Sequence, residues 1–260
     1  MMQKLNYYWR LIATAIAFTL FGLGGVIVPL LALPVLYLLP GGVSKRQLRA
    51  RKLVHWTFLI YIHIMRLLGI LTWEIDRLER LQRPGVLLLA NHPTLLDVVF
   101  LVAFIPNANC IVKSRLMMNP AMRGFVTLTG YITNDSAETL MESAKHSLQR
   151  GSALIVFPEG TRTQPGQALS FQRGAANIIV RAGVVPTPVV IRCEPATLSK
   201  QHKWYHIPKE KKFHLSFNVL DDLELDQFLA LSPSLGARHL TRYLEDFFSA
   251  KLQNNEHKNT

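Results

Sequence analysis

The feature that most constrains this chain is a stretch without any charged side chain, from Leu11 to Pro40. About twenty apolar residues are enough for a helix to cross the hydrocarbon core of a bilayer. We therefore predict an N-terminal membrane segment. Lys4 and Arg10 precede the apolar run as they would in a signal peptide, but the run is too long for one and no small-x-small cleavage site closes it.

Glycines and prolines inside this run are expected to interrupt a straight helix, so a single kinked span and a re-entrant hairpin are both open. These residues are Gly22, Gly24, Gly25, Pro29 and Pro34.

A basic segment follows at residues 45–52 and carries five cations in eight positions. The positive-inside rule places such a segment on the cytoplasmic side, and beside a membrane its expected partners are anionic lipid headgroups. Residues 53–73 are again mostly apolar but contain His55, His63 and Arg66. This mixture predicts a helix that lies in the membrane interface or packs against the first one.

The formal net charge of +12 is compatible with nucleic acid, an anionic membrane or acidic substrates. A basic and aromatic patch near the C-terminal third lacks any nucleic-acid-binding motif, so no nucleic-acid partner is expected. The patch consists of Lys200, Lys203, Trp204, Lys209, Lys211 and Lys212. The two cysteines, Cys110 and Cys193, have no metal-ligand spacing, and no metal site is predicted.

After Glu74 the sequence changes to short apolar runs that alternate with amphipathic segments, which is typical of an α/β domain. We predict an anchor and interfacial helix over residues 1–75, an α/β domain over 76–252 and a disordered tail over 253–260. Strands are expected at 86–90, 110–113, 130–132, 153–157, 184–191 and 214–220. Helices are expected at 94–104, from the cap at Asp135 to Arg150, at 171–182 and at 235–252.

Three local signals within this domain give further expectations. Asp135 with Glu138 forms a capping box for the helix that ends at Gly151. Arg123-Gly124 predicts a break in the chain. Pro186 and Pro188 imply that the strand at 184–191 is irregular or lies at the edge of the sheet.

The first motif with chemical content is Asn91-His92-Pro93-Thr94-Leu95-Leu96-Asp97, which follows the buried strand. On one uninterrupted helix, His92 and Asp97 would point about 140° apart. Pro93 favours a loop before the first turn of a helix, so Asp97 can reach back to the imidazole, fix its tautomer and raise its basicity. This is the pair that general-base catalysis of acyl transfer requires.

The second motif, Phe157-Pro158-Glu159-Gly160-Thr161-Arg162, lies at the carboxyl end of another predicted strand, where open α/β sheets bind ligands. Arg162 can clamp a phosphate or carboxylate, and Gly160 permits a tight turn close to a ligand. Glu159 can orient an acceptor or hold Arg162. A turn stapled by a local ion pair is the structural alternative.

With these two motifs, the sequence resembles the glycerolipid acyltransferases, a family typified by lysophosphatidic acid acyltransferase. The His-x4-Asp and Phe-Pro-Glu-Gly-Thr-Arg motifs of the family stand here unbroken and in order. Phe171-Gln172-Arg173-Gly174-Ala175 and Val185-Pro186-Thr187-Pro188-Val189 resemble two further blocks. The resemblance covers about residues 87–191 and implies a mixed sheet flanked by helices behind an N-terminal membrane anchor.

The resemblance implies that a fatty acyl group moves from an acyl-coenzyme A or acyl carrier protein thioester to a lipid hydroxyl, without a cofactor and without an acyl-enzyme. His92 would be the catalytic base and Asp97 its orienter. Glu159, Gly160, Thr161 and Arg162 would bind the acceptor. Secondary candidates are Asn91, Lys113, Arg115 and Arg173. The partners implied are membrane lipids and the acyl donor, at the cytoplasmic side of the cell (inner) membrane; the oligomeric state is left open.

The chain departs from the family at a block that usually reads Gly-x-Ile-Phe-Ile-Asp-Arg. Here Gly130-Tyr131-Ile132-Thr133-Asn134-Asp135-Ser136 replaces the phosphate-binding arginine by Ser136. Arg115, Arg123 and Arg173 are candidate substitutes for the missing charge. An acceptor other than lysophosphatidic acid, such as a specialised lipid without glycerol phosphate, is therefore an alternative.

Two functions from other classes also remain. A lipid hydrolase would use His92 and Asp97 with a serine, but the sequence has no Gly-x-Ser-x-Gly elbow. A non-catalytic membrane-binding protein would use only the apolar and basic segments.

Overall fold

The protein was analysed as a computed structural model that describes residues 2–163 and 167–253. The predicted disordered tail therefore lies, from residue 254 onward, outside the described residues. The elements in chain order are α1 (Met2–Leu38), α2 (Gly42–Leu67), β1 (Leu71–Asp76), η1 (Leu78–Leu81), β2 (Leu87–Ala90), α3 (Asp97–Phe104), β3 (Ala108–Val112), η2 (Ser114–Met118), α4 (Pro120–Thr129), β4 (Ile132–Thr133), α5 (Ala137–Gln149), β5 (Ala153–Val156), α6 (Arg173–Ala182), β6 (Pro186–Glu194), β7 (Phe213–Val219), α7 (Asp226–Leu229) and α8 (Pro233–Gln253).

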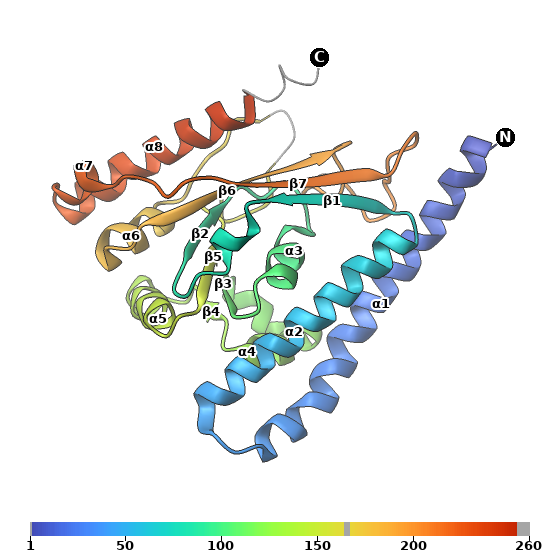
Figure 1. Cartoon of the computed structure of the whole chain (residues 1–260), viewed down its shortest axis with the longest axis horizontal. Coiled ribbons are helices and arrows are strands. Elements are labelled where there is room, and N and C mark those ends of the chain that lie inside the picture. The colour runs from blue at the N-terminus through green and yellow to red at the C-terminus, as the bar shows by residue number, and fades with distance from the viewer. Residues whose placement is uncertain (1, 164–166, 254–260) are drawn as a thin grey trace.

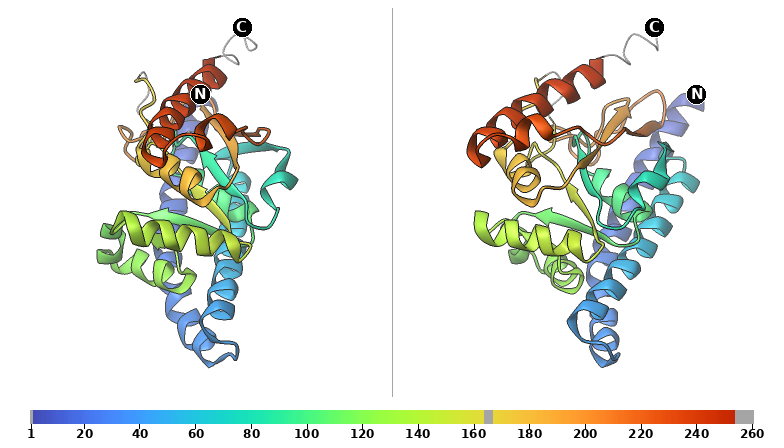
Figure 2. Two further views of the ribbon diagram at one scale, coloured as in Figure 1. Left: turned by 90° about the vertical axis from the view of Figure 1, so that its left-hand side faces the viewer. Right: turned by 60° about the vertical axis from the view of Figure 1, so that its left-hand side comes forward.

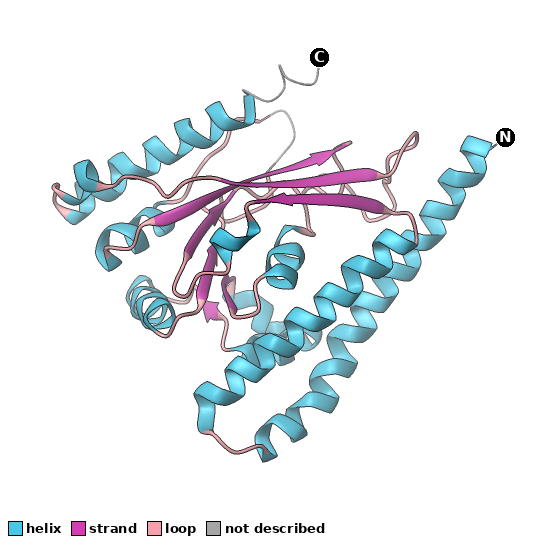
Figure 3. Ribbon diagram, in the orientation of Figure 1, coloured by secondary structure: helices cyan, strands magenta, loops and turns pink. Residues whose placement is uncertain are grey.

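A mixed sheet of seven strands in the order β1-β7-β6-β2-β5-β3-β4 forms the centre of the molecule (Figures 1 and 3). Neighbouring strands are parallel except for the antiparallel pair β6 and β7. Helices cover both faces, which confirms the predicted α/β fold class.

Strand β2 shows why a continuous apolar run is needed at the centre of such a sheet. Its four residues are all buried. Leu88 and Ala90 join the core beneath α1, α2 and α3, whereas Leu87 and Leu89 join the core beneath α5, α6 and α8. Figure 2 shows these two helical layers on opposite sides of the sheet.

Helix α1 is continuous from Met2 to Leu38, so of the two expected alternatives the structure has a single helical span and not a re-entrant hairpin within the apolar run. It forms an antiparallel hairpin with α2 and also packs against α4 (Figure 1). A Cβ at Gly124 of α4 would lie 2.8 Å from Pro29 Cβ, so a close approach of the two helices supports α1 where the proline removes a hydrogen bond. By length and composition α1 could cross a membrane.

The last six residues of the predicted helix at 53–73 were wrong, because α2 ends at Leu67 and residues 71–76 form β1. The sheet therefore begins before the predicted boundary at residue 76. Trp73 lies on this strand, where it pairs with Leu215 of β7. The strand β1 pairs with β7, about 140 positions later in the chain. No local pattern in the sequence of β1 reveals that pairing.

Strand β6 is central, between β2 and β7, so of the two alternatives predicted from its prolines the edge position was wrong and the irregular strand remains. The regular ladder with β7 begins only at Val189. Pro188 O and Pro186 O accept hydrogen bonds from Leu220 N and Leu223 N, beyond the end of β7. Pro186 and Pro188 thus lie before the start of the regular hydrogen-bond ladder between β6 and β7, so the absence of their N–H donors costs little.

Two smaller predictions, the chain break at Gly124 and the N-cap at Asp135, were also wrong. Gly124 does not break the chain but lies inside α4. The N-cap of α5 is Ser136 rather than Asp135, and its hydroxyl accepts a hydrogen bond from Thr139 N at 3.2 Å. Asp135 instead accepts a hydrogen bond from the Thr133 hydroxyl.

Candidate active site

The register between β2 and β5 brings the two sequence motifs together. Leu89 pairs with Val156 in this parallel pair, so the chain leaves both strands at the same edge of the sheet. His92 and Glu159 each lie three positions beyond that register pair. The His92 N–H consequently donates a hydrogen bond of 2.9 Å to Glu159 Oε1.

His92 and Asp97 are in contact, in the arrangement that Pro93 favours. His92 Nδ1 lies 2.8 Å from Asp97 Oδ2, with His92 on the loop and Asp97 at the first position of α3. The Asp97 side chain is fully buried, while 17% of the His92 side chain is exposed. With Nδ1–H donated to the carboxylate, Nε2 carries the lone pair, and it has no hydrogen-bond partner within residues 2–163 and 167–253.

Thr94 holds the carboxylate of Asp97 in place. Its backbone N–H donates to Asp97 Oδ2 at 2.7 Å and its hydroxyl donates to Asp97 Oδ1 at 2.6 Å. Both oxygens of this buried group are therefore satisfied on the protein side. The imidazole is also fixed by its other face, because the Phe157 ring stacks on it with ring centroids 4.2 Å apart.

Glu159 is hydrogen-bonded to the loop of His92 and forms no ion pair with Arg162 in the described residues. Its carboxylate accepts hydrogen bonds from His92 N–H and from the Thr163 hydroxyl, and Thr163 N–H donates to His92 O at 2.7 Å. Burial raises the pKa of the Glu159 carboxyl above its usual range, and the hydrogen bonds from His92 and Thr163 oppose that rise. The carboxyl thus links the two motifs.

The side chains of Arg162 and Asn91 are hydrogen-bonded to backbone groups. Arg162 Nη1 donates to Leu198 O at 2.9 Å and to Ser199 O at 3.1 Å. The Asn91 side chain exchanges two hydrogen bonds, of 2.8 and 2.7 Å, with the backbone of Ile191 on β6. Asn91 therefore fastens the end of β2 to β6, and Arg162 anchors the segment after β6 beside the site.

A concave, solvent-open surface lies beside the loop of Glu159 and carries several cations. Its lining residues are Lys113, Arg115, Asn134, Glu159, Gly160, Thr161, Gln172 and Lys200. Gly160 has a φ of +64°, a conformation that side chains other than glycine rarely adopt. The surface therefore joins residues from the segments that follow the neighbouring strands β5, β3 and β4, from the loop after β6 and from the N-cap of α6.

Of the secondary candidates, Lys113 and Arg115 line this surface, whereas Arg173 at the start of α6 does not. Arg123 lines a different depression, near Met117 and Met118. Of the three substitutes expected for the missing family arginine, Arg115 is thus the one that lies beside the predicted acceptor-binding residues.

An apolar cavity of about 200 Å³ lies between the helical hairpin and the sheet. It is lined by side chains of α1, α2, α3, α4 and β3, among them Phe21, Phe58, Val98, Val112 and Phe125. Val98 directly follows Asp97, and Val112 ends β3 at the same edge of the sheet as the site. The cavity offers a hydrocarbon-lined space next to the histidine and aspartate pair.

Three contributors to the site were not predicted from the sequence: Thr94, Phe157 as a stacking partner, and Thr163. Thr94 had a visible signal, since threonine at a helix start often binds a nearby backbone or side-chain group. Phe157 and Thr163 act on His92 across about 65 to 71 positions, and only the strand register reveals their contacts. No serine, threonine or cysteine side chain bonds to His92 among the residues that the structure describes.

The part of the chain that contains this site is similar to known acyltransferases. The Acyltransferase family profile matches residues 73–192. The chain is 33% identical over 125 residues to 1-acyl-sn-glycerol-3-phosphate acyltransferase of Helicobacter pylori, covering 45% of this chain and 53% of that one. It is 30% identical over 192 residues to a putative 1-acyl-sn-glycerol-3-phosphate acyltransferase of Caenorhabditis elegans, covering 68% and 66%. The chain thus spans about half of the Helicobacter pylori relative.

A solved structure extends the likeness to the whole fold. The crystal structure of the 1-acyl-sn-glycerophosphate acyltransferase PlsC from Thermotoga maritima matches with a TM-score of 0.66. The match covers 94% of this chain and 96% of that one at 18% sequence identity. At that identity the likeness shows the fold.

Proposed function

Because the chain belongs to the glycerolipid acyltransferase family, whose domain spans residues 73–192, we propose that it transfers a fatty acyl group from an acyl thioester to a lysophospholipid hydroxyl. The observation that carries the proposal is His92, fixed through Nδ1 by Asp97 at 2.8 Å with Nε2 open to a substrate. This geometry supports a general base rather than a nucleophile pair.

The proposed reaction is a direct transfer. His92 Nε2 takes the proton of the acceptor hydroxyl as its oxygen attacks the thioester carbonyl carbon. The carbon–sulfur bond then breaks, and the leaving thiolate receives that proton from the imidazolium, so the products are an ester and a thiol. Asp97, held by Thr94, stabilises the imidazolium formed on the way.

The proposed acceptor resembles the 1-acyl-sn-glycerol 3-phosphate named for the relatives. The cations of the concave surface support an anionic acceptor: Lys113, Arg115 and Lys200 lie there with Glu159, Gly160 and Thr161. We assign Arg115 and Lys113 the role of the arginine that Ser136 replaces. Arg162 would act by positioning the segment at Leu198 and Ser199.

The apolar cavity next to Val98 would hold an acyl chain. A fatty acyl chain gains roughly 0.8 kcal/mol for each buried methylene, so an apolar cavity of this kind can bind methylenes of the chain without polar contacts. The donor would be an acyl-coenzyme A or an acyl carrier protein thioester, both of which present such a chain.

We place the protein on the cytoplasmic face of the cell (inner) membrane, with α1 and the basic loop 200–212 against the lipid. Large apolar side chains of α1 are exposed, including Ile12 at 56% and Leu30 at 67%. Arg10 of α1 donates to the carbonyls of Lys209 and Lys211, so the basic loop lies beside the helix. An apolar face flanked by cations is typical of proteins that bind anionic membranes.

The test is acyl transfer by the purified full chain with 1-acyl-sn-glycerol 3-phosphate and either thioester donor. His92→Ala removes the base and should lower kcat by roughly 10²- to 10⁴-fold. His239→Ala, at an exposed histidine of α8, is the matched control and should keep full activity. Full turnover by His92→Ala with either donor would overturn the proposal.

A further inference from the structure

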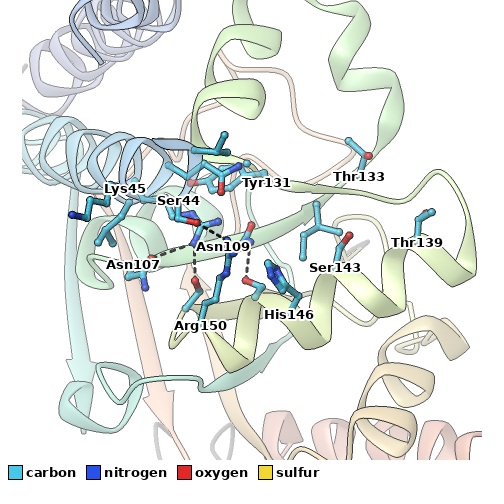
Figure 4. Close-up of a pocket in the computed structure, with 18 of the residues that line it drawn as sticks. Ser44, Lys45, Asn107, Asn109, Tyr131, Thr133, Thr139, Ser143, His146 and Arg150 are labelled. Atoms are coloured by element: carbon cyan, nitrogen blue, oxygen red, sulfur yellow. Dashed lines mark hydrogen bonds between the residues drawn. The ribbon is translucent and has the colours of Figure 1, made fainter. Parts of the chain in front are cut away.

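A second cavity of about 790 Å³, lined by many polar residues, is shown in Figure 4. It lies at the opposite end of the sheet from His92. Asn107 directly precedes β3 and Ser152 directly precedes β5, so both mark the amino ends of these parallel strands. The first turns of α2 and the exposed side of α5 form the walls, and Figure 4 shows Ser44 and Lys45 facing His146 and Arg150 across the space. The proposed reaction uses none of these residues.

Arg51 is a buried cation in this cavity, with 8% of the residue exposed. Its Nε donates to Thr129 O at 2.9 Å, and Nη1 donates to Asn107 Oδ1 at 3.2 Å and to Ser152 Oγ at 2.7 Å. These acceptors are all neutral. Within the described ranges Nη2 has no hydrogen-bond partner and no carboxylate lies within 4.0 Å of the guanidinium.

A second guanidinium approaches from the other wall. Arg150, directly after α5, donates from Nη1 to Ser44 Oγ at 2.7 Å and has no ion pair in the described part of the chain. Burial lowers the pKa of Arg51, the nearby Tyr131 and Cys110 oppose that shift, and the like charge of Arg150 adds a smaller lowering. Lys45 also lines the cavity, whereas Asp135 is its one lining carboxylate among the described residues.

An uncompensated buried charge is costly, and a second cation beside it increases the cost. An anion with several oxygens would remove this cost and would accept hydrogen bonds from both guanidinium groups. Phosphate has the required charge and geometry, since arginine forks bind its oxygens bidentately. The hydroxyl of Ser143 on α5 would then be available to a polar group attached to the phosphate.

We propose that this cavity is a binding site, separate from the active site, for the phosphate group of an anionic ligand, with Arg51 and Arg150 as its two principal contacts. The volume exceeds that of free phosphate and fits a phosphate ester. Val43 at the rim is 57% exposed and lies close to Leu38 and Leu39 at the hairpin turn, which are 86% and 43% exposed. A lipid headgroup and a soluble phosphate ester carry the same recognisable chemistry.

The experiment is calorimetric titration of the purified full chain in a neutral detergent with inorganic phosphate and, separately, with dihexanoyl phosphatidate. Arg150→Gln is the informative variant because Arg150 is exposed and its loss leaves the hydrogen bonds of Arg51 intact. Loss of one charged hydrogen-bond donor should weaken binding roughly 10- to 100-fold. Arg242→Gln, at an exposed arginine of α8, is the matched control and should bind like the wild type.

Ser143→Asp, which adds a carboxylate on the exposed wall, should also weaken binding while the melting temperature without ligand is kept. Tighter binding of the lipid than of inorganic phosphate would assign the source as a headgroup, and equal affinity would assign a free phosphate ester. Absence of saturable binding at millimolar concentration, or equal affinity of Arg150→Gln and wild type, would overturn the proposal. Binding lost in Arg115→Gln but kept in Arg150→Gln would belong to the active site and would also overturn it.

Discussion

At the scale of single residues, the candidate site depends on a buried acid that hydrogen-bonds to the loop of His92. Glu159 is 7% exposed and links His92 to Thr163. His92 would perform the chemistry, but Glu159 determines where the backbone of His92 lies. The carboxyl is therefore a positioning group, and its protonation couples to the stability of the loop.

Glu159→Gln is expected to change how stability depends on pH. Because burial raises the pKa of this carboxyl above 4.5, the folded chain holds the proton more tightly than the unfolded chain. Ionisation of Glu159 thus lowers the free energy of unfolding as the pH rises from 4.5 through the folded pKa. The glutamine variant cannot ionise at this position and does not lose stability in this way. The free energy of unfolding of the variant, relative to that of the wild type, should therefore increase as the pH rises through this range.

Denaturant titration in detergent at a series of pH values measures that difference. Glu224→Gln, at an exposed position, controls for the loss of one carboxylate. A difference that decreases with rising pH would mean that the ionised Glu159 is the favoured form, contrary to the expectation.

At the scale of elements, α1 is tied to the domain by close helix packing as well as by apolar area. Its small residues Ala13 and Ala17 are buried in the core that also contains α2 and α3 residues. Farther along, Pro29 of α1 meets Gly124 of α4. The helix is thus a packed part of the fold with one exposed face.

Gly124→Ala should destabilise this contact, because the added Cβ would lie 2.8 Å from Pro29 Cβ. Overpacking costs roughly 1–3 kcal/mol, and the helix propensity of alanine returns up to about 1 kcal/mol, so a net loss near 1 kcal/mol is expected. Thermal unfolding of the two proteins measures it.

Gly174→Ala in α6 is the matched control, since no atom lies within 4 Å of its added Cβ. That variant should be as stable as the wild type or slightly more stable. Equal melting temperatures for both variants would show that α1 and α4 separate freely at this point.

At the scale of the whole molecule, the apolar surface is distributed unevenly. The face of α1 that is not packed carries exposed side chains such as Leu23 at 52% and Leu30 at 67%, while the far side has few, for example Leu235 at 39%. The sheet and its outer helices lie on the other side of this hairpin (Figure 2). This asymmetry gives the molecule one side suited to lipid.

Leu23→Asp combined with Leu30→Asp should release the protein from membranes. Charges on the lipid face of a helix cost roughly 2.5–3.5 kcal/mol each at the membrane centre and less near the surface, so the bound fraction should decrease at least about tenfold. Flotation with anionic vesicles measures binding, and circular dichroism confirms that the fold persists. Leu235→Asp is the matched control; equal release by both would contradict a lipid-facing α1.

Much of the fold and of the chemistry is local, and the sequence determined those parts. The apolar run specified α1, the buried run at 87–90 specified a central strand, and Pro93 separated His92 from the helix that begins at Asp97. The contact of His92 with Asp97 spans only five positions and depends on one turn. Such features follow from backbone geometry and residue type alone.

Only the tertiary structure decided which strands are neighbours, and with it the remainder of the site. Glu159 accepts a hydrogen bond from the His92 N–H because β2 pairs with β5. The Asn91 side chain is hydrogen-bonded to the Ile191 backbone because β6 pairs with the other side of β2. Arg51 and Arg150 share a cavity although 99 positions separate them. Contacts of this kind depend on strand order and helix packing, which are set by burial of the whole chain and leave no periodic signal in any short segment.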